Sequence, residues 1–132
     1  KDSQKFRMQV VKSLNLRSDK AGIFIKIEEK YDRIRQEAIE RINQSVGQLE
    51  KLMSGAQPDE KKMKELNAAI ASDQDILVNT YKGRRDEIMA ILTPNQQSEY
   101  MLLTWKWQQK LLEQYGKQKA GPQSEEKKEK AP

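Results

Sequence analysis

The side chains that could do chemistry in this 132-residue chain are mainly carboxylates and thioethers, because histidine and cysteine are both absent. The absence of histidine removes the commonest general base and the commonest transition-metal ligand. Acids such as Asp73 and Asp75, or Asp86 and Glu87, have no base or nucleophile beside them, and neighbouring acids on a helix point in different directions. The six glycines are scattered rather than gathered in a phosphate-binding loop. We therefore expect no enzymatic activity and no cofactor, and we interpret these acids as solvated surface.

The methionines are the remaining candidates for a metal site. Thioethers suit a soft ion such as copper(I) where they cluster. Met53 and Met63 lie on either side of one predicted turn, but a flexible apolar side chain that fills a loose turn is the commoner role of methionine. We expect no metal site among the five: Met8, Met53, Met63, Met89 and Met101.

Binding through a mixed apolar and basic surface is the chemistry that the sequence supports best. Isolated apolar side chains fall away from the main apolar stripes of the expected helices, and lysines and arginines lie between them. Such a surface would attract acidic segments at long range and hold exposed apolar groups weakly at contact. A subunit interface, or an ordinary scatter of surface apolar residues, explains any one of them equally well. The candidate binding residues are Ile25, Arg35, Lys82, Arg85, Met89, Met101 and Trp105.

Apolar residues at spacings of three and four predict four helices that would position these side chains. Gly55 is suited to the C-terminal cap of the first long helix, and Pro58 to the first position of the helix that follows. A connection this short forces the two long helices to lie antiparallel. The expected helices cover residues 3–14, 19–53, 58–92 and 94–118.

The last expected helix has two apolar faces. Met101, Trp105 and Leu112 lie roughly 100° or more away from the main face. One face would pack on the long helices and the other on a second subunit, so we expect a homodimer. The main face consists of Tyr100, Leu103, Trp107, Leu111 and Tyr115.

Residues 92–96 form a complete helix-start signal. Thr93 can accept a hydrogen bond as the N-cap, Pro94 suits the first helical position, and Gln96 falls where a capping box needs it. One long helix must therefore end near Leu92, and the last helix begins immediately afterwards.

A degenerate copy of this signal starts at Leu16. Arg17 stands where the threonine would be and Lys20 where the glutamine would be, so Ser18 is expected to cap the helix one position later. Two copies of Leu-Thr-x-x-Gln that flank a long hairpin resemble the Spy/CpxP family of small, all-helical periplasmic proteins. The resemblance covers roughly Phe6 to Tyr115.

The resemblance implies an all-α fold in which short N-terminal and C-terminal helices pack on a long antiparallel hairpin. In the family such hooked hairpins pair into a curved, dimeric cradle. It further implies an ATP-independent periplasmic chaperone that binds unfolded or misfolded proteins during envelope stress. The alternative is a periplasmic stress-responsive or metal-responsive regulator that docks on a membrane sensor protein. Metal-binding relatives use mainly histidine, which this chain lacks.

The net charge of +5 lies at the two ends of the chain. Residues 1–17 carry five basic and one acidic side chain, residues 117–132 add two more positive charges, and the helical middle is nearly neutral. Mixed signs along helices are typical of solvated surface. We therefore expect no nucleic-acid binding.

Composition also predicts the domain organisation. Residues 1–119 are expected to form a single helical domain, and residues 120–132, which lack large apolar side chains, a disordered charged tail. No apolar run approaches the roughly 20 residues needed to span a bilayer. The first residue is Lys1 rather than methionine, which fits removal of an export signal and a shortened chain equally well.

Overall fold

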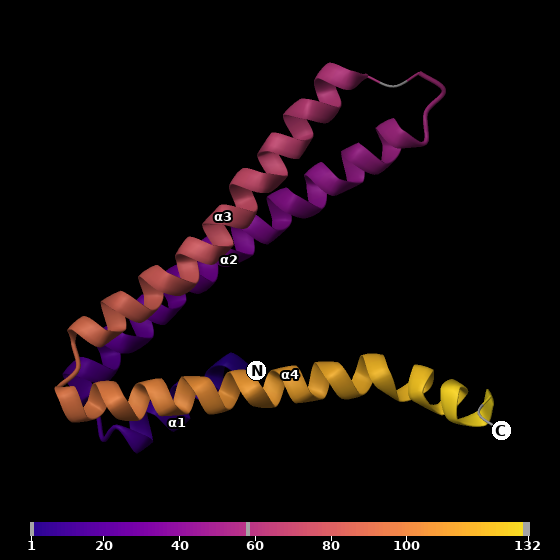
Figure 1. Cartoon of the computed structure of the whole chain (residues 1–132). Helices are drawn as coiled ribbons and strands as arrows, with labels where there is room; N and C mark the ends of the chain where they lie inside the picture. Colours follow the sequence, from indigo (N-terminus) through magenta and orange to yellow (C-terminus); the bar gives the residue numbers. More distant parts are fainter. Residues whose placement is uncertain (1, 58, 131–132) are drawn as a thin grey trace. The chain divides into compact units, whose positions relative to one another are not determined.

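The chain forms four α-helices, shown in Figure 1. The computed structural model describes the backbone of residues 2–57 and 59–130, and the side chains of residues 3–57 and 59–116. Within that part of the chain there is no strand, so the all-α prediction is confirmed. No helix in the same part is both long and apolar enough to cross a membrane. The helices are α1 (Asp2–Ser13), α2 (Ser18–Met53), α3 (Glu60–Ala90) and α4 (Pro94–Lys130).

The helices group into two compact units. One unit is Arg17–Ile91, which contains α2 and α3, and the other combines Lys1–Leu16 with Leu92–Pro132, which contain α1 and α4. Each unit has its own packing and is described by itself. The single domain expected over residues 1–119 stays a prediction.

Helices α2 and α3 lie side by side and run antiparallel (Figure 1). The side-chain contacts fix the direction, because Lys30 contacts Glu87 whereas Arg41, further along α2, contacts Asp73, which comes earlier in α3. At a rise of 1.5 Å per residue, the 36 residues of α2 span about 54 Å. The pair therefore forms a long rod with a large surface for its volume.

The turn between α2 and α3 differs from the expected one. Ser54, not Gly55, is the C-cap residue; its backbone is in the right-handed region and its hydroxyl donates to the carbonyl of Lys51 at 3.1 Å. Because this hydroxyl satisfies a terminal carbonyl, the turn needs no left-handed glycine, and no described glycine has a positive φ. Pro58, expected at the first helical position, lies outside the described residues. Helix α3 begins at Glu60, and the Asp59 carboxylate accepts from the Lys62 N–H at 3.1 Å as its N-cap.

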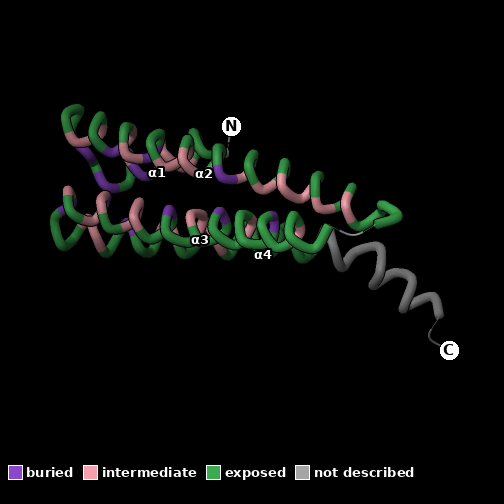
Figure 2. Tube along the Cα trace, turned by 90° about the horizontal axis from the view of Figure 1, so that it is seen from above, coloured by how far each residue is buried: buried purple, intermediate pink, exposed green. Residues whose placement is uncertain are grey.

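The core of the long pair is narrow, as the few purple segments in Figure 2 show. Its buried apolar side chains are Phe24 and Ala38 on α2, with Leu66 and Ile88 on α3. Ile23 is 47% exposed, whereas the adjacent Phe24 is fully buried. Glu28, one turn after Phe24, is also buried, so the buried face of α2 includes a charged residue, which the spacing of apolar residues does not reveal.

Helix α1 packs antiparallel on the first part of α4. The Phe6 and Trp107 rings contact each other with centroids 5.4 Å apart, and Val10 and Tyr100 are buried. The 12 residues of α1 span about 18 Å, which is much shorter than α4. The contact therefore leaves the later turns of α4 uncovered by α1.

The helical backbone of α4 continues past the expected end near Gln118 to Lys130. No side chain beyond Gly116 belongs to the described part of the chain. The disorder expected for residues 120–132 rests on composition alone and stays a prediction.

Candidate functional site

The residues of the Leu-Thr-x-x-Gln signal form a capping box at the start of α4. The Thr93 N–H donates to Oε1 of Gln96 at 3.0 Å, and the Gln96 N–H donates to Oγ1 of Thr93 at 3.3 Å. Pro94 is the first residue of the helix, where a missing N–H costs nothing. Leu92, just before the cap, is 7% exposed. The helix-start geometry is therefore the one that the sequence predicted for these four residues.

The Gln96 side chain also holds the end of α1. Its Nε2 donates to the carbonyl oxygen of Leu14 at 3.2 Å, while its Oε1 remains in the capping box. Carbonyls at the end of a helix have no partner within the helix. One carboxamide thus satisfies the terminus of α1 and the terminus of α4 together.

The degenerate copy of the signal ends α1 and does not cap α2. Asn15 adopts a left-handed conformation with φ of 53°, and the Leu16 N–H donates to the Val11 carbonyl at 3.1 Å, as in a Schellman motif. Arg17, not Ser18, is the N-cap residue of α2, and no side chain caps it. The prediction that Ser18 caps this helix was wrong, because Ser18 is itself the first helical residue. Leu16 is 9% exposed.

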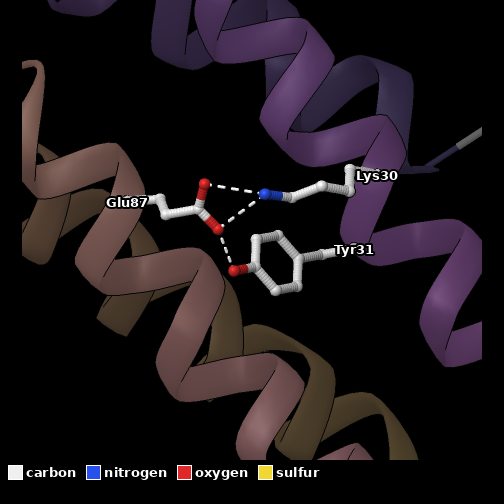
Figure 3. Close-up of polar contacts among 3 residues, drawn as sticks. All are labelled: Lys30, Tyr31 and Glu87. Carbon is white, nitrogen blue, oxygen red and sulfur yellow. Dashed lines mark hydrogen bonds and ion pairs between the residues drawn. The ribbon is translucent and has the colours of Figure 1, made fainter.

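A polar cluster joins α2 to α3, and Figure 3 shows it in close-up. Nζ of Lys30 lies 2.7 and 2.8 Å from the two carboxylate oxygens of Glu87, and the hydroxyl of Tyr31 donates to the same carboxylate. Gly83 makes the approach possible, since a Cβ at that position would lie 2.9 Å from the Tyr31 hydroxyl oxygen. These contacts fix the register of the two helices.

Two further carboxylates at the contact between α2 and α3 are buried. Together with the cluster around Glu87 they form what we call the polar seam. Glu28 is 3% exposed and pairs with Arg84 at 3.5 Å, whereas Asp73 is 8% exposed and accepts from Nε of Arg41 at 3.0 Å. The interpretation of Asp73 as solvated surface was therefore wrong, because Arg41 reaches across from α2 to neutralise it. A charged side chain can be buried in a folded protein when it is paired with a side chain of opposite charge. The seam accordingly joins the two helices.

Five of the candidate binding residues lie on the α2–α3 unit. The Arg35 and Lys82 side chains are exposed, whereas Ile25 and Met89 are only partly exposed. Arg85 is partly exposed and contacts the carboxylate of the adjacent Asp86 at 3.2 Å. The exposed lysine and arginine are therefore available to an incoming ligand, and the apolar members of this group are less accessible.

The other two candidates, Met101 and Trp105, lie on α4 and are 42% and 58% exposed. Helix α4 carries the two apolar faces that the sequence predicted. On the main face Tyr100 is buried, whereas the later members Leu111 and Tyr115 are exposed. Among the described residues, the exposed large apolar side chains of α4 are Met101, Leu102, Trp105, Leu111, Leu112 and Tyr115. Leu102 was not predicted from the sequence. The signal for it was its position on the same helix as Met101 and Trp105, which were predicted.

Metal ligands do not gather anywhere in the described residues, where no group of three or more acidic, histidine or cysteine side chains could hold an ion. Met53 is 72% exposed at the end of α2, and Met63 is partly exposed.

No known protein family, no curated protein and no solved structure matches the chain. The candidate site therefore rests on the side chains of this molecule, and its strongest feature is the exposed apolar surface of α4.

Proposed function

We propose that this protein is an ATP-independent chaperone that binds unfolded or misfolded proteins. The observation that carries the proposal is the exposed apolar surface of α4, above all Met101, Trp105 and Leu112. Contiguous exposed apolar surface is uncommon on soluble monomers and marks sites of interaction. A binding role of this kind needs no catalytic group, and we propose that the protein is not an enzyme.

The form of the surface supports loose binding of many partners. A chaperone without an energy source must release its clients when they fold, so its hold on them has to be weak. Side chains that project from a helix make shallow contacts with a client. Releasing the client from such contacts costs less free energy than releasing it from a deep pocket. Met101 also adapts its shape easily to different partners, because methionine is flexible and polarizable.

The finer architecture belongs to the same proposal. We propose that α1 and α4 pack on the α2–α3 pair as a hooked hairpin, and that two chains associate into a cradle. The resemblance of residues 92–96 to the Spy/CpxP signature supports this arrangement, and it also supports a periplasmic location and a role in envelope stress. The alternative, a regulator that docks on a membrane sensor protein, would use the same exposed face for a single folded partner.

The test measures aggregation of a chemically unfolded enzyme by light scattering, without ATP. Molar excess of the protein should suppress the scattering. The variant Met101→Gln with Leu112→Gln should suppress it much less, because two apolar contacts on α4 are lost. The matched control, Met8→Gln with Met53→Gln, changes two side chains on α1 and α2 that are 65% and 72% exposed, and it should act like the parent protein.

Two results would reject the chaperone. One is unchanged client aggregation at molar excess, at both low and high salt. The other is equal loss of activity in the test and control variants, which would assign the effect to overall hydrophobicity. The first result, combined with binding to one folded partner, would favour the regulator.

A further inference from the structure

The α1–α4 unit contains a groove lined by residues of both helices. Its volume is about 330 Å³, at the lower end of the roughly 300–1,000 Å³ of ligand pockets. Trp107 and Leu111 supply its apolar side chains, and Trp107 is held in place by its contact with Phe6. The described residues that line it are Lys5, Gln9, Trp107, Lys110, Leu111 and Gln114.

The charges of this groove are one-sided. Lys5 from α1 and Lys110 from α4 both border it, and none of the described residues that line it carries a carboxylate. The sequence around Lys5 adds to the positive charge, since residues 1–17 carry five basic and one acidic side chain. An anionic ligand is therefore favoured, and a cationic one is repelled.

Two glutamine side chains in the groove further restrict the kind of ligand that it fits. Gln9 and Gln114 each present a donor and an acceptor, which together match the N–H and C=O groups of a peptide backbone. The indole of Trp107 and the side chain of Leu111 offer apolar contact to one large side chain. Two lysines, two carboxamides and an apolar pair thus suit an extended peptide in which acidic residues flank an apolar one.

We propose that this groove binds the acidic–apolar segments of unfolded chains, with Lys5 and Lys110 selecting the flanking carboxylates. The inference rests on the proposed chaperone function and names the client segment that the protein prefers. Selection by sequence comes from charge, and the weak hold on the apolar side chain leaves release possible.

The test uses two synthetic nine-residue peptides with the same central Phe-Leu pair, flanked by glutamates in one and by lysines in the other. Titration calorimetry on the full chain should give the acidic peptide a dissociation constant lower by about tenfold or more, because two charge-assisted contacts form. The variant Lys5→Glu with Lys110→Glu should abolish or reverse this preference. The control, Lys12→Glu with Lys106→Glu, makes the same charge change on the same two helices outside the groove and should keep it.

Several outcomes would overturn the inference. They are equal affinity for both peptides, equal loss in the control variant, and competition by a fatty acid that binds as tightly as the acidic peptide. Sedimentation in which only the groove variant loses self-association would assign the groove to a second copy of the chain. If the protein suppresses aggregation but binds both peptides equally, the proposed role of the groove is wrong and the proposed chaperone function stands. If the protein prefers the acidic peptide but does not suppress aggregation, the chaperone function is wrong and the peptide-binding groove stands.

Discussion

The Gln96 side chain, at the start of α4, donates a hydrogen bond to the carbonyl oxygen of Leu14, the residue that follows α1, at 3.2 Å. The two residues are 82 positions apart; Gln96 belongs to the helix-start signal, and Leu14 lies two residues before the degenerate copy of it. The same carboxamide accepts from the Thr93 N–H. The glutamine of this signal therefore ties one helix terminus to another, which a local capping role alone does not require.

This double role predicts unequal costs of substitution. Gln96→Ala removes the hydrogen bond to Leu14 and half of the capping box, so it should lower the free energy of unfolding by about 2 kcal/mol. Thr93→Ala removes only the hydroxyl acceptor and should cost about 1 kcal/mol. Urea denaturation followed by circular dichroism measures both. An equal or smaller cost for Gln96→Ala would show that the contact with Leu14 adds no stability.

A second prediction concerns Gly83, which admits the Tyr31 ring. Alanine favours helix by about 1 kcal/mol over glycine, but here its Cβ would lie 2.9 Å from the Tyr31 hydroxyl oxygen. Displacing the ring should break the hydrogen bond to Glu87, so Gly83→Ala is expected to destabilise by about 1–2 kcal/mol net. Thermal unfolding measures the change.

Gly47 provides the matched control for this substitution. Nothing lies within 4 Å of a Cβ at Gly47, so Gly47→Ala should stabilise α2 by up to about 1 kcal/mol. In a Tyr31→Phe background, Gly83→Ala should cost less, because the closest atom is gone. A cost that is unchanged in that background would contradict the steric explanation.

A third prediction tests the polar seam. Arg41 and Asp73 are 3.0 Å apart, and the Asp73 side chain is 11% exposed, so a double-mutant cycle with Arg41→Gln and Asp73→Asn should give a coupling of about 1 kcal/mol or more. Lys62 and Glu65 serve as the comparison, since they lie 3.9 Å apart on exposed helix surface. Their coupling should be near zero. Equal couplings would mean that burial adds nothing to the pair.

A fourth prediction concerns self-association through α4. Trp105 is 58% exposed, and burying it against a second chain would remove a large apolar side chain from water. Sedimentation at tens of micromolar should give a dimer mass, and Trp105→Lys should shift it toward the monomer. Val78→Lys alters a side chain that is 69% exposed on α3 and should leave the mass unchanged. A monomeric parent protein would contradict the dimer.

Local signals explain which features the sequence could predict. The start of α4 depends on Thr93, Pro94 and Gln96, which act on their own backbone, so spacing was enough to find it. The two apolar faces of α4 followed from helical periodicity alone, whereas the exposure of its later turns follows from the shortness of α1. Such features need no knowledge of what lies opposite.

Tertiary pairing explains what the sequence could not predict. Asp73 was predicted to be solvated because its partner, Arg41, is 32 positions away in the sequence. Glu28 is likewise buried against a distant partner, Arg84 on α3, and such a pair cannot be recognised from the spacing of residues within α2. The groove beside Trp107 combines α1 and α4, whose partnership no spacing within either helix reveals. Charge pairs and grooves between distant segments therefore had to come from the structure.

The last prediction concerns how an unfolded client is captured. Lys82 is exposed on α3 and Arg85 is partly exposed beside it, so early association should depend on charge. Raising the salt from 0.15 M to 1 M shortens the Debye length from about 8 Å to about 3 Å and should slow association in stopped-flow fluorescence. The variant Lys82→Glu with Arg85→Glu should slow it at low salt, with helicity unchanged by circular dichroism. The variant Lys61→Glu with Lys64→Glu makes the same charge change elsewhere on α3 and should have less effect. Association that ignores salt, or that slows equally in both variants, would exclude capture by these two side chains.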